Sequence, residues 1–597
     1  FANTALVGNN LDATVKVEAA YRRAVPALEK LTRENPAVTK YRQQLARAHH
    51  LMATFYQEIE QTAKAEAAQQ QALGIRANLA REHQDVITFQ EELAETLSQL
   101  GDIHQAANQP DRAEEVWRKA LSVWEQLTRN PNANANTFRS RHFHAQQANT
   151  YVKLGSLCLS SGRKEQAEVE YGKAIKLRVK VVQDDPQDEG HNTLLAYTLS
   201  FASRAYEANG RSDQAVAAVG KALTVWQTLA RAHAGALKYR EAEADCYTRL
   251  GDLHSKVGGR EQAEAAYKKS LAVREGLPAQ ELAKAPQQQA LADTYGGLGR
   301  LYRGAGRMQE AEAAHIRTVA IREGLARAEP NNTTSQRQLA AAFNDLARTY
   351  HTADRRKEAE AADKKNLAIW EKLALKQPNN VQFQIILGES RNNLGWLAIQ
   401  DDRLQDGLDW FSRSAGTLQP LLAKGEQSPF LKPTLCNAHW GRANALLRLG
   451  RLPESIADWD LALKHDQGAS RDSLRLGRAC ATALQGEHVQ ATALAKELVD
   501  KAPQNGDVLY GAVYVYCLAS EAVHRDTSLA ATAGDKLAGQ YTSEALALLA
   551  RANTVGAFAT PLRVRSLKTD KLLDPLRSRE PFKKLLADLE KARPASR

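Results

Sequence analysis

The chain has 597 residues, of which 25% are charged and 6% are aromatic. A single hydrophobic core does not extend to this length, so we expect several domains or one long repeat array. No apolar run reaches the roughly 18 residues that a membrane-spanning helix needs, which excludes membrane insertion of this segment.

The positive charge is concentrated at the C-terminal end. Of the formal net charge of +11, residues 560–597 contribute +6, from 11 Lys and Arg against 5 Asp and Glu, and the rest of the chain carries +5. A nucleic-acid-binding array would carry a basic stripe along its length. No nucleic-acid partner is therefore expected, and the basic tail is interpreted as a solvated segment.

In chain order, the first helical pattern lies at residues 16–28, where Val17 begins a regular series of small residues. The series continues at Ala65, Ala113, Ala167, Ala215, Ala263, Ala311, Ala359, Gly407, Ser455 and Ala491. The exceptions to an even spacing are a longer step after Ala113 and a shorter one before Ala491. Every other step spans about 48 residues, and a fixed period of this length predicts a repeat array.

The period divides the chain into four expected parts. Residues 1–40 form a partial N-terminal repeat, and residues 41–430 form the long repeats of this period. Shorter repeats follow at 431–506, and a helical C-terminal cap with a basic tail occupies 507–597.

Other positions keep the same register. Five residues before the small residue stand types that tolerate a left-handed backbone, namely Asn108, Gly162, Gly210, Gly258, Gly306, Asp354, Asp402, Gly450 and Gly486. Four residues after it, a ring recurs at Trp117, Tyr171, Tyr267, Phe411 and Trp459. Twelve residues before it, a Leu-Gly pair recurs. Each unit is therefore predicted to be helix, turn, helix, with small residues that let the helices approach and a ring that fills the gap.

One position alternates between two unlike residue types. Eleven residues after the small residue stand Arg76, Trp124, Arg178, Trp226, Arg274, Arg322 and Trp370. Offset 11 returns to the packing face of a helix. We expect these large side chains to form a ladder along the stack, with some arginines over a neighbouring ring.

The Leu-Gly pair, the turn residue, the small residue and the ring together resemble the tetratricopeptide repeat. The resemblance implies an all-α, right-handed superhelical solenoid that binds other proteins, here with extended helix-turn-helix repeats. That family's unit has roughly 34 residues. The roughly 14 additional residues here, if shared equally, lengthen each helix by about two turns to about 20 residues.

The resemblance also implies which side chains face the inner surface. In the family, inward positions lie three before, one after and four after the repeat glycine. Transferred to this chain, they give a candidate peptide-binding groove of Arg300, Arg303, Asn344, Arg348, His351, Asn392 and Trp396. Because guanidinium groups favour carboxylates and amides bond a peptide backbone, the expected partner is a protein or an extended acidic peptide segment. A solvated charged face is the alternative.

The C-terminal end resembles the repeat tail of bacterial serine/threonine protein kinases. The phrase at 570–586 matches that family's closing motif through Asp570, Leu573, Asp574, Pro575, Leu576, Arg577, Phe582, Leu585 and Leu586. The resemblance implies a docking or sensory tail behind a kinase domain that precedes this chain. The segment would then be cytoplasmic or, if the kinase spans a membrane, extracytoplasmic. A stand-alone scaffold is the alternative.

No catalytic, cofactor or metal site is expected. The triplet His524-Arg525-Asp526 resembles the kinase catalytic loop, but the metal-binding Asn that should follow is Ala531. His142 and His144 lack a helical His partner or Glu base in the sequence. Five cysteines stand far apart without a CxxC pair. The chain is therefore interpreted as a non-enzyme, with an enzyme of unrecognised site as the alternative of another class.

Overall fold

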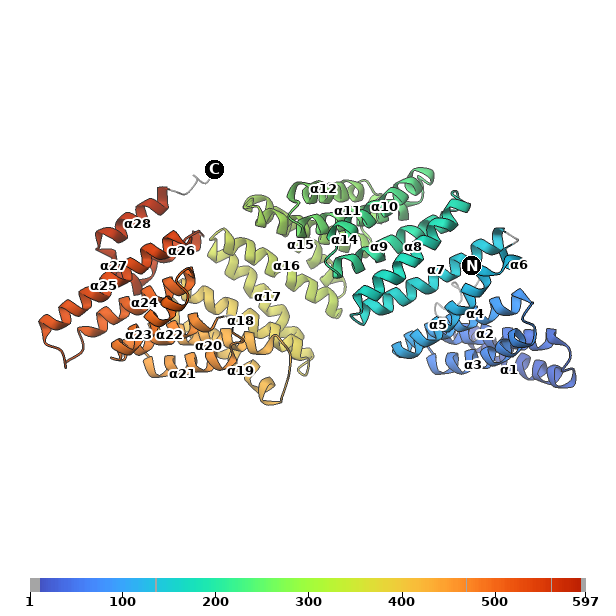
Figure 1. The fold of residues 1–597 in the computed structure, drawn as a ribbon, viewed down its shortest axis with the longest axis horizontal. Helices are drawn as coiled ribbons and strands as arrows, with labels where there is room; N and C mark the ends of the chain where they lie inside the picture. Colours follow the sequence, from blue (N-terminus) through green and yellow to red (C-terminus); the bar gives the residue numbers. More distant parts are fainter. Residues whose placement is uncertain (1–10, 135–136, 469, 560, 592–597) are drawn as a thin grey trace. The chain divides into compact units, whose positions relative to one another are not determined.

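A computed structural model describes residues 11–134, 137–468, 470–559 and 561–591 (Figure 1). Within these ranges the regular elements are helices and there is no β-strand, which confirms the all-α prediction. None of the described helices is long and apolar enough to cross a membrane. The first ten residues of the expected partial repeat and the last six of the basic tail lie outside the described residues.

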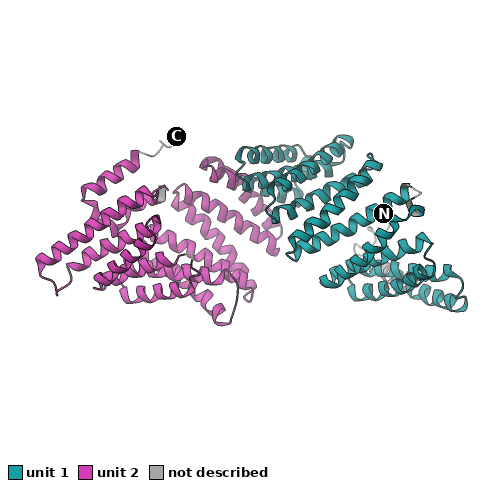
Figure 2. Ribbon diagram, in the orientation of Figure 1, with its two compact units in different colours: residues 1–297 teal, residues 298–597 magenta. Residues whose placement is uncertain are grey.

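The chain divides into two compact units, residues 1–297 and 298–597 (Figure 2). The division falls inside α14 (Ala285–Gly304), within the run of long repeats. In each unit, consecutive antiparallel helix pairs stack on one another as a solenoid.

The first unit consists of α1 and five helix pairs. They are α1 (Leu11–Glu34), α2 (Thr39–Glu58) with α3 (Thr62–Glu82), α4 (Ile87–Ala106) with α5 (Pro110–Arg129), α7 (Thr137–Ser160) with α8 (Lys164–Asp184), α9 (Glu189–Ala208) with α10 (Ser212–Ala232), and α11 (Leu237–Lys256) with α12 (Arg260–Glu275). Two single-turn helices, α6 (Pro131–Asn134) and α13 (Ala279–Leu282), lie between pairs.

The second unit continues the pairs after α14 and ends in short helices. It holds α15 (Met308–Ala328), α16 (Thr333–Thr352), α17 (Arg356–Lys376), α18 (Val381–Gln400), α19 (Leu404–Ala423), α20 (Leu431–Arg448), α21 (Leu452–His465), α22 (Arg471–Leu484), α23 (His488–Lys501), α24 (Gly506–Val523), α25 (Ala531–Thr554), α26 (Pro561–Thr569), the 3₁₀ turn η1 (Lys571–Leu573), α27 (Asp574–Arg577) and α28 (Glu580–Lys591). The helices of the pairs are long up to α19 and become clearly shorter at α21, α22 and α23.

The turns inside the helix pairs have the predicted left-handed backbone. Glycine occupies the turn in most pairs, for example Gly306 with φ 78°. Three residues other than glycine adopt the same conformation at the predicted position: Asn108 and Asp354 with φ 57°, and Asp402 with φ 60°. Because a side chain in this region strains the backbone, a non-glycine residue there calls for a compensating role.

The rings pack against glycines of first helices, at Gly251 as the register predicts and at Gly441 outside the predicted Leu-Gly series. A Cβ added to Gly251 would lie 2.6 Å from the Tyr267 ring, and one added to Gly441 would lie 2.2 Å from the Phe411 ring. Glycine at these positions therefore lets a ring lie flat against the helix backbone. This close approach fills the space between neighbouring helices at native density.

All seven members of the expected ladder are buried. Trp124, Trp226 and Trp370 contact a ring on the following first helix, respectively Phe143, Tyr239 and Phe383. Arg76, Arg274 and Arg322 donate hydrogen bonds to the following first helix, respectively to Thr96, Gln287 and Gln338. At Arg76 and Arg274 these bonds take the place of the expected ring contact.

Candidate functional site

The candidate groove residues lie on α14, α16 and α18, the first helices of three successive repeats. In the second unit, first helices pack on first helices, as α18 does on α20 and α22 on α24. The first helices therefore share one continuous face, and side chains outside the packing contacts project from it.

Arg300 and Arg303 converge on one carboxylate, that of Asp345 on α16. Arg300 Nη1 lies 3.1 Å from Asp345 Oδ2, and Arg303 Nη1 lies 3.1 Å from the Asp345 carbonyl oxygen and 3.5 Å from its Oδ1. Asp345 follows the predicted Asn344 by one residue. It is not among the predicted residues because the family's inward positions lie three before, one after and four after the repeat glycine. Two guanidinium groups on one carboxylate leave a surplus positive charge.

Arg348 and His351 extend this cluster along α16. Arg348 is exposed, and its side chain has no hydrogen-bond or ion-pair partner among the described residues. Asn344 is half-buried one turn before it. His351 turns instead toward its own repeat, where its Nε2 lies 2.9 Å from Oδ2 of the buried Asp363 on α17. Arg348 is therefore the most available cation of the group.

Asn392 and Trp396 do not join this cluster. Asn392 is fully buried and donates from Nδ2 to the Thr434 carbonyl oxygen at 3.0 Å. It offers no surface to a partner, contrary to the expectation. Trp396 donates from Nε1 to Asn437 Oδ1 at 2.9 Å, and its ring meets that of Trp440 edge-on. Both side chains belong to the seam between α18 and α20, because these two first helices pack closely.

His315 lies in the ring position of α15 beneath the arginine cluster. It is fully buried, and an added Cβ on Gly299 would lie 2.6 Å from its ring. Burial lowers the pKa of His315 to about 4, and the charges of Arg303 and Arg300 act in the same direction while Asp345 opposes them. The imidazole is therefore neutral at pH 7 and adds no charge to the cluster.

The closing motif of the sequence is a packing and hydrogen-bonding unit. Leu573, Leu576 and Phe582 are buried in the same hydrophobic cluster as α24. Arg577 donates to the carbonyl oxygen of Asp570 at 2.6 Å and to those of Leu567 and Lys568. These packing contacts and hydrogen bonds account for the spacing of the motif residues, so the motif has a structural role here.

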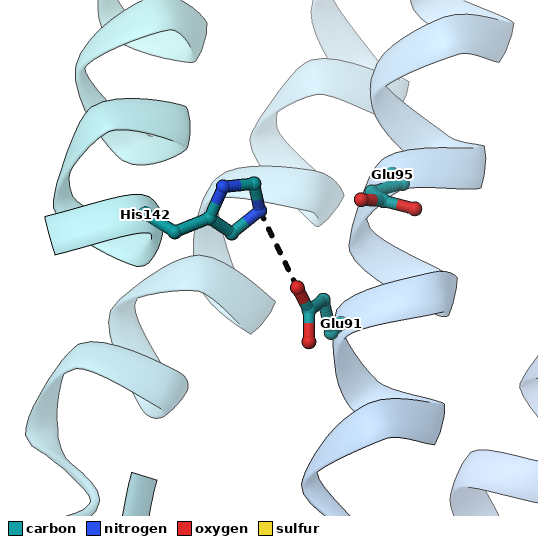
Figure 3. Close-up of side chains that lie close together, drawn as sticks. All are labelled: Glu91, Glu95 and His142. Carbon is teal, nitrogen blue, oxygen red and sulfur yellow. Dashed lines mark ion pairs between the residues drawn. The ribbon is translucent and has the colours of Figure 1, made fainter. Parts of the chain in front are cut away.

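One cluster with metal-ligand types forms across α4 and α7 (Figure 3). His142 Nε2 lies 3.3 Å from Glu91 Oε1, and one ligand atom each of Glu91, Glu95 and His142 lies within 4.8 Å of the others. Burial raises the pKa of Glu95, and the charge of Glu91 adds to this. The set includes types that Zn²⁺ accepts, but all three are half-buried and His142 already pairs with Glu91. The sequence did not reveal this contact because it joins helices of two successive repeats.

Two family models of the tetratricopeptide repeat match the chain. One matches residues 93–128, 291–325 and 339–374, and the other matches residues 46–79, 148–178 and 244–276. Each match covers parts of a first helix and the second helix that follows it. The chain therefore contains tetratricopeptide repeats, an architecture typical of non-enzymatic protein-interaction scaffolds. No curated protein matches the chain.

Several solved structures resemble the fold. BtubC (BKLC) from P. vanneervenii is 21% identical over 44% of this chain and 92% of its own, with a TM-score of 0.33. The apo form of RapI is 9% identical over 68% and 98%, with a TM-score of 0.42. The apo form of the quorum sensor NprR from B. thuringiensis is 14% identical over 69% and 99%, with a TM-score of 0.39.

Proposed function

We propose that this array of tetratricopeptide repeats binds partner proteins, and that the arginines of α14 and α16 capture an extended acidic segment of one of them. The observation that carries the proposal is the surplus of guanidinium groups around Asp345. Arg300 and Arg303 both pair with Asp345, and the exposed Arg348 adds a third guanidinium group whose charge acts on Arg303.

The arginine cluster can exchange part of its contact with Asp345 for contacts with several carboxylates of a partner. The Arg300 side chain is 51% exposed, so its pair with Asp345 is held loosely in water. An incoming Asp or Glu can bond Arg348 directly and draw Arg300 away from Asp345. Arg303 is 15% exposed and stays paired with Asp345, so its guanidinium group keeps a fixed position in the cluster. Such a surface speeds association and weakens as salt screens the charges.

The test is binding of a fluorescent acidic peptide, for example a decapeptide of alternating Asp and Gly, to the full chain. Changing Arg300→Glu and Arg348→Glu together should weaken binding at least tenfold, and raising salt should weaken wild-type binding. Arg317→Glu with Arg327→Glu, on exposed positions of α15, makes the same charge change away from the cluster. Equal affinity of the two double variants would refute the proposal.

The second part of the proposal concerns context. We infer that the array is the docking or sensory tail of a bacterial serine/threonine protein kinase, and the closing motif from Asp570 to Leu586 supports this by resemblance. A stand-alone scaffold is the alternative. The genomic reading frame upstream of the codon for Phe1 tests it, because a kinase catalytic domain in frame would support the tail and a start codon there would support the scaffold.

A further inference from the structure

The C-terminal segment crosses back over first helices of the second unit. We call α26 and η1, residues 561–573, the strap. Its Val564, Leu567 and Leu573 are at most 3% exposed and belong to the hydrophobic cluster that contains α22 and α24. The strap is therefore a packed part of the fold.

Polar contacts tie the strap to distant repeats. Arg565 pairs with Asp354, 211 residues earlier, and Lys571 Nζ lies 2.7 Å from Asp402 Oδ2, 169 residues earlier. Asp354 and Asp402 are the two aspartates with left-handed backbone in the turns of consecutive repeats. The bond from Lys571 lowers the pKa of Asp402, so this carboxylate stays charged. The strained turn residues thus have a compensating role as anchors for the strap.

A cavity of about 740 Å³ lies between the strap and the first helices α18, α20, α22 and α24. Its apolar wall includes Trp396, Trp440, Leu476 and Tyr510. This volume is in the range of pockets that enclose a ligand of a few residues. The strap therefore converts an open helical face into a walled site.

The charges around the cavity neutralise one another. Arg356 pairs with Asp401 at 2.7 Å, Arg448 pairs with Asp402 at 2.7 Å, and Arg563 pairs with Asp507. With Arg565 and Lys571 also paired, five cations of the lining have acidic partners. A charged ligand would gain little here, because it would have to displace an existing partner.

Hydrogen-bonding groups remain available in the same wall. Asn444 and Ser473, both half-buried, line the cavity, and neither side chain has a hydrogen-bond partner among the described residues. The wall thus offers an amide and a hydroxyl suited to a peptide backbone.

We propose that the strap-walled cavity is a second protein-binding site, for an extended uncharged segment of a partner whose large apolar side chain fills the aromatic wall. The backbone of the bound segment is held by Asn444 and Ser473. This site is separate from the arginine cluster and does not depend on it. Aromatic and aliphatic side chains supply the affinity by burial of apolar surface.

The probe is a phage-displayed library of random heptapeptides, selected on the full-length wild-type chain. The selected peptides should be enriched in large apolar residues and poor in charged ones. Synthetic versions should lose at least tenfold in affinity for the Asn444→Trp variant, whose new ring fills the cavity. Ser473→Trp fills the same cavity from α22 and provides a second variant if the first does not fold, as judged by circular dichroism.

Matched measurements distinguish the two sites. The same peptides should bind the Arg300→Glu, Arg348→Glu variant as tightly as wild type, and the Asp-Gly decapeptide should bind Asn444→Trp unchanged. Failure to select any peptide, selection of charged sequences, or equal affinity for wild type and both cavity-filling variants would overturn the proposal. None of these outcomes bears on the arginine cluster.

Discussion

Two regions on first helices of the second unit differ in what covers them. The arginine cluster on α14 and α16 is open, and its cations exceed the single carboxylate of Asp345. The cavity at α18–α24 is covered by the strap, and the cations that line it have acidic partners. The arginine cluster lies outside the ring and small-residue contacts that hold the repeats together, whereas Trp459 of the ring series also lines the cavity. At the arginine cluster the residues that fix helix positions are therefore different from those that supply surface chemistry, and at the cavity the two sets overlap.

The largest expected effect comes from loosening the strap. Leu567 is 1% exposed, so Leu567→Ala removes buried apolar volume and should lower the free energy of unfolding by about 2–5 kcal/mol. Hydrogen exchange should accelerate in α26 and α24 while α14–α16 keep their protection, because the strap covers only one of the two regions. Urea unfolding and exchange mass spectrometry measure both. Equally accelerated hydrogen exchange in α14–α16 would contradict the statement that the strap covers only the cavity region.

Acid should weaken the repeat beneath the arginine cluster. The pKa of His315 is lowered from 6.5 to about 4 in the folded protein, so below pH 6.5 the unfolded chain gains a proton that the folded chain does not. Stability should fall as pH drops from 6.5 to 4, by about 3 kcal/mol from this residue.

His315→Phe places in this position the residue type found at Phe411 and removes the titration. The free energy of unfolding of wild type minus that of the variant should fall by about 3 kcal/mol between pH 7 and pH 4, measured by urea unfolding. A constant difference across this range would show that His315 does not titrate as described. Because other buried histidines titrate in both proteins, only the difference between them is informative.

A methyl group against the Phe411 ring should disturb the packing of α20 on α19. Gly441→Ala places a Cβ 2.2 Å from Phe411, so the ring must shift, and overpacking of this kind costs about 1–3 kcal/mol of unfolding free energy. Gly416→Ala, in α19 with open space around it, should instead stabilise by about 0.5–1 kcal/mol. Thermal unfolding of the pair measures the contrast. If both variants were stabilised, the close approach of the ring to the helix would be wrong.

The smallest effect is expected at the strap anchor. Asp402→Gly relieves the left-handed turn but removes the partner of Lys571 and Arg448, and each of these pairs, formed by a partly exposed carboxylate, contributes at most about 1 kcal/mol. The two changes oppose each other, so the unfolding free energy should change by less than about 1 kcal/mol. Exchange in η1 should nevertheless accelerate. Gly450→Ala, which strains the equivalent turn without touching the strap, is the control.

The sequence predicts the features that recur in every repeat, whereas contacts that occur only once in the chain were not predicted. The period predicts the turns, the ring positions and the buried ladder, because each occupies a fixed position in the repeating unit. Asp345 was missed because a shift of one residue on a helix changes the face by about 100°. The burial of Asn392 depends on how closely α18 and α20 pack, and the strap depends on pairs between its own residues and turns several repeats earlier. No local pattern reports contacts of these kinds.

The buried ladder makes the units non-interchangeable. A unit ending in Trp370 requires Phe383 on its successor, and a unit ending in Arg274 requires Gln287. Exchanging two such modules would place a guanidinium group against a ring, leaving a buried donor without an acceptor. The seams at Trp370 and Arg274 are therefore not equivalent, and such contacts limit which units can follow one another in the array.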